Sequence, residues 1–135
     1  IRLDFPEYEQ QNRSHTISAK SLSSLFLSLY YSTVLEARSS SYLLSLMQDT
    51  AFDVEELAQL PENVKISHKF GQYELNDTVL FHDCGIMYID EGRFFYCIMT
   101  KGENMDSLLK DTQVIVNHIY QYIDFTRGKN EAFRE

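Results

Sequence analysis

Three predicted β-strands between Val64 and Gly102 constrain the fold most, because apolar residues recur there with a period of two and not at helical spacing. The faces of the first strand alternate: one carries Val64, Ile66, His68 and Phe70, and the other carries Lys65, Ser67, Lys69 and Gly71. Thr78 to Ile89 and Phe94 to Thr100 follow as further strands, with Asp90 to Arg93 as a hairpin turn. Both later strands are almost continuously apolar, which indicates a sheet covered on both faces.

Helical patterns flank this predicted sheet. Residues 1–17 are predicted to be a loop and residues 18–60 to be helical, with a first helix that Ser18 caps and that ends near Leu35. A second helix starts near Ser39 to Ser41, with its apolar stripe at Tyr42, Leu43, Leu46 and Met47, and a third runs from Asp53 to about Leu60.

A long C-terminal helix is predicted over residues 104–127, after the strands of residues 64–102. Gly128 is expected to end it, with residues 129–135 as a frayed tail. The apolar stripe expected to pack on the sheet comprises Met105, Leu108, Leu109, Val114, Ile115, Ile119, Tyr122 and Ile123.

Composition limits the size and the partners of the chain. Its 135 residues are 44% hydrophobic, so we expect residues 1–135 to form one domain or part of one. The net charge of −8 argues against nucleic acid, because phosphate binding needs clustered Lys and Arg. No apolar run approaches the roughly 18 residues of a membrane span. The chain begins with Ile and not with Met, so we expect the natural N-terminus to be missing.

The motif His68-Lys69-Phe70-Gly71 is the leading candidate for chemistry. A cation followed by a glycine on an edge strand could bind an anionic ligand against the backbone. The residues alone favour a structural interpretation, in which an exposed lysine precedes a glycine that marks a bulge. Thr100-Lys101-Gly102 likewise resembles an anion cradle but is more simply the end of a strand.

Two other patterns resemble nucleophile sites. His82-Asp83-Cys84 places Cys, His and Asp together, but strand alternation turns Asp83 to the face opposite His82 and Cys84. Ser107-Leu-Leu-Lys110 matches Ser-x-x-Lys, yet it lies on the last helix far from any second motif, so we interpret it as a chance match.

The two cysteines, Cys84 and Cys97, lie on neighbouring predicted strands. They could form a disulfide if they were directly opposite. Free cysteine is also among the most buried residue types, and we favour two buried free thiols. No His or Cys cluster has metal-ligand spacing, so no metal and no cofactor are expected.

Several motifs in order make the chain resemble the C-terminal part of class A β-lactamase-like serine hydrolases, of the penicillin-recognising group of β-lactamases and D,D-peptidases. They are Ile17-Ser-Ala-Lys20 through Phe26 and Tyr30, Leu60-Pro-Glu, His68-Lys-Phe-Gly71, His82-Asp-Cys-Gly-Ile86 and Cys97-Ile-Met-Thr-Lys-Gly102. The resemblance implies part of the β-lactamase/transpeptidase-like α+β fold: a three-stranded antiparallel sheet with N-terminal helices and a long C-terminal helix packed on it. It also implies acyl transfer on β-lactams or D-alanyl peptides, outside the cytoplasm.

The resemblance implies roles for four residues of the first strand. Lys69 would hold the substrate carboxylate and tune proton transfer, and Gly71 would let the ligand approach the backbone. The N–H of Gln72 would form half of the oxyanion hole. Phe70 departs from the family's Lys-Thr/Ser-Gly box, because it lacks the hydroxyl that bonds the substrate carboxylate.

The resemblance also shows what this chain lacks. The family's nucleophile, on a Ser-x-x-Lys motif, and its Ser-x-Asn motif lie upstream of the matching region, so the chain alone is expected to be inactive. Residues 1–16 contain no Glu-x-x-Leu-Asn, and neither Glu7 nor Glu9 takes the deacylating role. Two missing N-terminal strands complete the family's five-stranded sheet, so we expect a partner chain carrying them or self-association. A non-catalytic binding or structural domain is the alternative.

Overall fold

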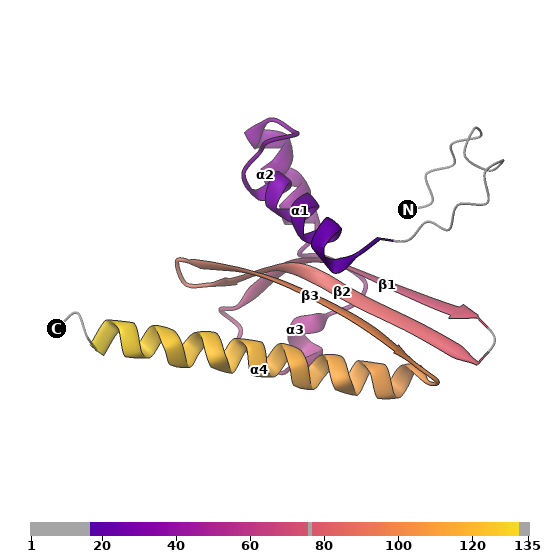
Figure 1. Ribbon diagram of the computed structural model, residues 1–135. Helices are drawn as coiled ribbons and strands as arrows, with labels where there is room; N and C mark the ends of the chain where they lie inside the picture. The colour runs from indigo at the N-terminus through magenta and orange to yellow at the C-terminus, as the bar shows by residue number, and fades with distance from the viewer. Residues whose placement is uncertain (1–16, 76, 133–135) are drawn as a thin grey trace.

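One antiparallel sheet, in the order β1-β2-β3, forms the centre of the molecule. The computed structural model describes residues 17–75 and 77–132; the loop predicted for residues 1–16 and the last three residues of the predicted tail lie outside that part. The elements are α1 (Ala19–Tyr30), α2 (Ala37–Leu46), α3 (Val54–Leu57), β1 (Lys65–Leu75), β2 (Thr78–Ile89), β3 (Gly92–Gly102) and α4 (Met105–Ala132). Helices α1 and α2 lie on one face, and α3 and α4 on the other (Figure 1). The predicted α+β fold is confirmed.

The two faces of the sheet have separate cores. Toward α3 and α4 the strands bury Ile66, Met87, Ile89, Tyr96 and Ile98 against Val54, Val116 and Ile123 of the helices, and Val79 and Phe81 against Leu108. Toward α1 and α2, Cys84 and Ile86 pack against Leu22, Phe26, Leu29 and Leu44. The pairing of β1 with β2 is continuous from Lys65 to Leu75, without a bulge. The alternation predicted for β1 is therefore correct, and Gly71 does not mark a bulge.

Helix α1 is shorter than predicted. Ser18 caps it as expected, since its side chain accepts a hydrogen bond from the N–H of Ser21. The helix ends at Tyr30 and not near Leu35, because Ser32 takes a left-handed conformation with φ of 54°. Thr33 N–H then bonds the carbonyl of Ser28, which closes the helix in the way that a glycine usually does.

Helix α2 also differs from its prediction, because it buries another face. Ser40 and Leu44 are its buried residues, and the predicted stripe residues Tyr42 and Leu46 are exposed. Ser40 is suited to the close packing because its hydroxyl bonds the carbonyl of Leu35. A serine therefore lies on the side of α2 that faces the sheet, and apolar spacing alone did not predict this side.

Helix α4 turns part of its predicted stripe away from the sheet. Its buried residues are Leu108, Thr112, Val116 and Ile123, whereas Val114, Ile115 and Tyr122 are exposed. Thr112 is tolerated in the core because its hydroxyl bonds the carbonyl of Leu108. The helix also continues through Gly128 to Ala132, because Arg127 anchors its end to the β2–β3 hairpin through the carbonyl of Ile89 and the carboxylate of Asp90.

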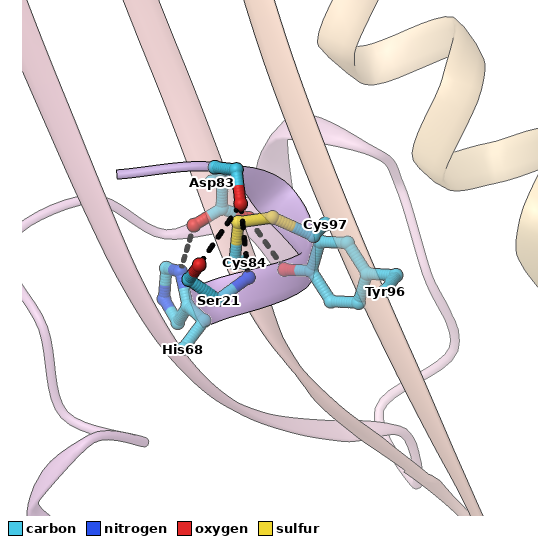
Figure 2. The surroundings of a disulfide bond; sticks show 7 residues. Ser21, His68, Asp83, Cys84, Tyr96 and Cys97 are labelled. Atoms are coloured by element: carbon cyan, nitrogen blue, oxygen red, sulfur yellow. Dashed lines mark hydrogen bonds and ion pairs between the residues drawn. A yellow bond between two sulfur atoms is a disulfide. The ribbon is translucent and has the colours of Figure 1, made fainter. Parts of the chain in front are cut away.

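The two cysteines form a disulfide, so the expectation of free thiols is wrong. Cys84 and Cys97 are directly opposite in β2 and β3, with their Cα atoms 3.9 Å apart (Figure 2). The hairpin loop explains the error. Ile89 pairs with Gly92, so the loop has two residues and not the predicted four. The predicted turn would have shifted the register by two residues and moved the cysteines apart.

Candidate functional site

The outer edge of β1, the side away from β2, is bonded to other described residues before Phe70 but not beyond it. Before that residue, the protein itself occupies the edge. The N–H of Ile66 donates to the carboxylate of Glu55 in α3 at 2.9 Å, and the N–H of His68 donates to the carbonyl of Met47 at 3.0 Å. These two contacts show that the even-numbered residues of β1 direct their backbone groups away from β2.

Beyond His68, none of the described residues bonds to the same edge through a backbone N–H of β1. By alternation the N–H groups of Phe70 and Gln72 point outward like those of Ile66 and His68. Within residues 17–75 and 77–132, no group accepts a hydrogen bond from either of them. Gln72 is exposed as well. Two outward backbone donors, two residues apart on β1, therefore have no acceptor among the described residues.

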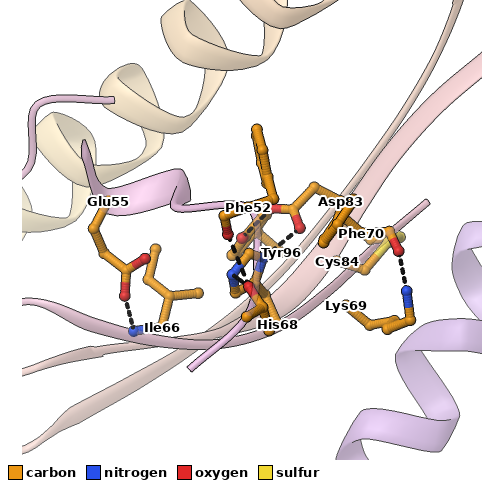
Figure 3. A network of polar contacts seen from close by, with 11 residues as sticks. Phe52, Glu55, Ile66, His68, Lys69, Phe70, Asp83, Cys84 and Tyr96 are labelled. Atoms are coloured by element: carbon orange, nitrogen blue, oxygen red, sulfur yellow. Dashed lines mark hydrogen bonds and ion pairs between the residues drawn. A yellow bond between two sulfur atoms is a disulfide. The ribbon is translucent and has the colours of Figure 1, made fainter. Parts of the chain in front are cut away.

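The ammonium group of Lys69 lies at this open edge. Although Lys69 starts on the face of α1 and α2, its Nζ donates a hydrogen bond to the outward carbonyl of Phe70 (Figure 3). It also lies 4.9 Å from the centre of the Phe70 ring. Phe70 is held in turn by the ring of Phe52, at 5.2 Å between centroids. The Lys69 ammonium and two outward N–H groups thus lie along one stretch of the β1 edge, where an anionic ligand could bind.

Because Gly71 has no side chain, the ring of His82 can pack against its backbone. A Cβ at Gly71 would lie 2.6 Å from Nε2 of His82, so the imidazole of His82 packs directly on the glycine. Burial, together with the nearby Lys69 ammonium, lowers the pKa of His82, and Asp83 opposes this effect. His82 is therefore a partly buried, preferentially neutral ring beside the candidate edge.

A buried polar network lies on the opposite face, directly behind this edge. His68 Nδ1 is 2.6 Å from Oδ1 of Asp83, and Tyr96 donates its hydroxyl proton to the other carboxylate oxygen (Figures 2 and 3). Nε2 of His68 is 2.8 Å from the hydroxyl of Thr50. Burial, with the charge and hydrogen bond of Asp83, raises the pKa of Tyr96 well above its usual range.

The sequence did not suggest this network, although it held one signal. Alternation correctly separated Asp83 from His82 and Cys84, and it placed His68 on an inward face. A histidine and an aspartate that both point into a core need partners. That requirement could have been used to look for Tyr96 and Thr50.

The remaining sequence candidates do not form a second site. Cys84 is fully buried and bonded to Cys97, so it cannot act as a nucleophile. Ser107 and Lys110 are both exposed at the start of α4, where the N–H of Ser107 bonds the side chain of Asn104 as part of the helix cap. Thr100 to Gly102 belong to the end of β3.

The described part of the chain offers no metal site: across residues 17–75 and 77–132, no three His, Cys, Asp or Glu residues gather in a way that could hold an ion. Nor does any helix in these ranges have the length and apolar character to cross a membrane.

The fold is similar to that of the protein PBP-A. One structure of PBP-A superposes with a TM-score of 0.55 at 20% sequence identity, over 87% of this chain and 49% of PBP-A. A second, of a PBP-A mutant in an acyl-enzyme complex with penicillin G, gives a TM-score of 0.56 at 21% identity, over 76% of this chain and 39% of the other. The chain therefore spans about half the length of PBP-A or less.

The sequence defines the family. Residues 2–123 match the model of the β-lactamase enzyme family, so this chain belongs to that family. The predicted resemblance to β-lactamase-like serine hydrolases is confirmed. None of the curated proteins is similar enough in sequence to count as a match.

Proposed function

We propose that this chain supplies the substrate-binding edge of a serine hydrolase that acts by acyl transfer on β-lactams or D-alanyl peptides. The observation that carries the proposal is the open edge of β1, where the Lys69 ammonium meets the outward N–H groups of Phe70 and Gln72. Membership of the β-lactamase enzyme family supports it. So does the fold shared with PBP-A, which is described in an acyl-enzyme complex with penicillin G.

Each group at the edge has a distinct task in the proposal. Lys69 pairs with the substrate carboxylate, which is a charge-assisted interaction. The N–H of Gln72 donates to the carbonyl oxygen under attack, and one such donor is worth about 2.7–4 kcal/mol in the transition state. Gly71, between them, has no side chain, and because the ring of His82 fills the space on that face, the ligand in this proposal reaches the backbone along the outer edge of the strand.

Phe70 modifies this scheme. It cannot donate the hydroxyl hydrogen bond that the family's motif gives to the substrate carboxylate. Its ring instead packs against Phe52, on the far face of the sheet from Cys84. Lys69 and the backbone still bind the substrate in this proposal, and we expect turnover to be slower than in a family member that has the hydroxyl.

The nucleophile is proposed to come from outside these 135 residues. Two surfaces are suited to the rest of such a fold. The outer edge of β3 directs the backbone groups of Phe95, Cys97 and Met99 away from β2, and no described residue pairs with them. On α4, a shallow apolar groove is lined by Val114, Ile115, His118, Ile119 and Tyr122. We propose that the missing N-terminal part of the fold, or a second copy of the chain, covers these surfaces.

The disulfide is evidence about the cellular compartment in which the protein works. Such bonds persist outside the reducing cytosol in most organisms. Cys84 and Cys97 therefore support the proposal that the protein works in the cell envelope or is secreted.

A labelling experiment tests the proposed function. The intact protein that carries this chain is incubated with a fluorescent penicillin and with a chromogenic cephalosporin, in parallel with the isolated 135 residues. We expect covalent label or hydrolysis with the intact protein and neither with the isolated chain. An intact protein that is neither labelled nor active would overturn the proposal. That result would favour the second candidate, a non-catalytic binding domain, which the loss of the hydroxyl at Phe70 suggests.

Assembly is tested separately by sedimentation. The isolated chain is expected to self-associate, or to bind a chain that carries the missing part. A clean monomer with no second chain would contradict this part of the proposal.

A further inference from the structure

Four segments meet in the buried network behind the edge. Thr50 comes from the connection between α2 and α3, His68 from β1, Asp83 from β2 and Tyr96 from β3. His68 and Asp83 are 1% and 0% exposed, and their hydrogen-bond partners are protein groups. No buried polar side-chain atom of the described residues lacks a partner. The protons of this network can therefore be assigned by counting donors and acceptors.

The hydroxyl of Thr50 fixes one proton of His68. Thr50 has a single hydroxyl hydrogen, and it donates this hydrogen to the carbonyl of Phe52 at 2.8 Å. The contact of 2.8 Å between Thr50 and Nε2 of His68 then requires the nitrogen to donate. His68 therefore carries a hydrogen on Nε2.

Asp83 fixes the second proton. One of its oxygens accepts from Tyr96, so the other faces Nδ1 of His68 at 2.6 Å. Two acceptors cannot share so short a contact, so one proton lies between Nδ1 and Oδ1. A proton on Nδ1, beside the one on Nε2, makes His68 an imidazolium ion and Asp83 its carboxylate partner.

Gly85 makes this arrangement possible. It is the residue of β2 directly opposite His68. A Cβ at Gly85 would lie 2.6 Å from Cβ of His68 and 2.6 Å from the carbonyl oxygen of Ser67. Without that side chain, His68 and Tyr96 both reach across β2 to the same carboxylate.

We propose that His68 is a positioning residue for the Lys69 to Gln72 edge, held as an imidazolium ion by Asp83 and Thr50. Its ring and its backbone N–H both bind the connection that follows α2, through Thr50 and Met47. They fix β1 immediately before Lys69, at the point where the protein stops covering the edge and ligand donors begin. The effect on substrate rests on the proposed function; the protonation state does not.

Nitrogen-15 NMR of the histidine rings in the intact protein tests the protonation. At neutral pH we expect His68 to show N–H signals on both ring nitrogens, with the Nδ1 proton shifted strongly downfield. Asp83→Asn should remove the Nδ1 hydrogen and leave Nε2–H. Thr50→Val should do the reverse and leave Nδ1–H. A single ring N–H in the unmodified protein would overturn the assignment. The opposite changes in the two variants are not expected from general destabilisation.

Acylation by fluorescent penicillin tests the positioning. Asp83→Asn should slow acylation about 10- to 100-fold, because small displacements of positioning groups have effects of this size. Val116→Ala, a buried change in α4, serves as the stability control and should slow it much less. Equal losses in both variants, or an unchanged rate in Asp83→Asn, would refute the positioning role. An unmodified protein that is not acylated at all would instead refute the proposed function and leave the NMR result to stand.

Discussion

Gly85 shows how one residue without a side chain determines the packing of its neighbours. The space above it is filled by His68, which leans across the strand toward Asp83. Gly71 has a similar relation to His82 on the other face. In both cases the glycine is explained by the side chain of the strand opposite, and not by an unusual backbone angle, since no described glycine has a positive φ.

Gly85→Ala is expected to destabilise the protein by about 1–3 kcal/mol, because the new methyl group would meet backbone atoms that cannot move aside. Gly102→Ala is the matched control. Its methyl group would meet only the end of the flexible Leu108 side chain, at 2.9 Å. Urea denaturation of both variants measures the difference. Equal stability losses would contradict the assigned role of Gly85.

His82 gives the protein a predictable pH dependence. Burial, with help from Lys69, lowers its pKa below the ordinary value of about 6.5. The unfolded chain therefore takes up the proton first as pH falls. The contribution of His82 to stability is present above about pH 6.5 and is lost as the pH falls toward the folded-state pKa. Melting temperatures measured from about pH 8 to about pH 5.5 should fall less steeply for His82→Asn. Parallel curves for the two proteins would show that His82 does not contribute.

At the scale of elements, the hairpin between β2 and β3 sets the strand register that allows the disulfide to form. Its two-residue loop, with Asp90 at a φ of 51°, places Cys84 opposite Cys97. The disulfide lies beneath α1, beside Ile86 and Phe95. It crosslinks β2 and β3, and Cys84 is the residue of β2 directly opposite Lys69, so the disulfide is expected to stabilise the sheet directly behind the candidate edge.

Replacing both cysteines by alanine should cost about 2–4 kcal/mol, as is typical when a disulfide across a short loop is removed. The two cysteines are 13 residues apart in sequence. Dithiothreitol should lower the urea midpoint of the unmodified protein and leave that of the double variant unchanged. A midpoint of the unmodified protein that does not respond to full reduction would contradict the stabilising role.

The strands could be predicted from the sequence, but the faces of the helices could not. A period of two is specific, and the predicted range of β2 is the observed one. Helix α4 has apolar residues on two sides, so its pattern could not show which side meets the sheet; Thr112 is buried and Val114 exposed. The end of α1 depends on Ser32, a residue with no strong preference for the left-handed conformation that it adopts.

The candidate site was predictable only through the family motif. Lys69 and Gln72 were selected by resemblance, and the residues alone favoured a structural role. The sequence could not show that the N–H groups of Ile66 and His68 are covered while those of Phe70 and Gln72 are open. That difference depends on where Glu55 and Met47 lie after folding, which is a property of tertiary packing.

At the scale of the whole molecule, the two edges of the sheet differ in the groups that they expose. Among the described residues, the β1 edge has a cation and outward N–H groups without an acceptor, and the β3 edge has outward backbone groups without a partner. An apolar groove lies on α4. The β1 edge is suited to a small anionic ligand and the β3 edge to more protein. The similarity to PBP-A covers 87% of this chain and 49% of PBP-A, so the fold of this chain corresponds to part of a larger structure.

The central claim is tested most directly by the rate at which fluorescent penicillin acylates the intact protein, compared between Lys69→Ala and Lys65→Ala. Both lysines are exposed on the same strand, four positions apart. Loss of the Lys69 contact to the substrate carboxylate should slow acylation about 10- to 100-fold, the usual effect of losing a hydrogen bond to a charged group. Lys65→Ala should leave the rate nearly unchanged. Equal rates in the two variants would contradict the assignment of the β1 edge as the substrate-binding site.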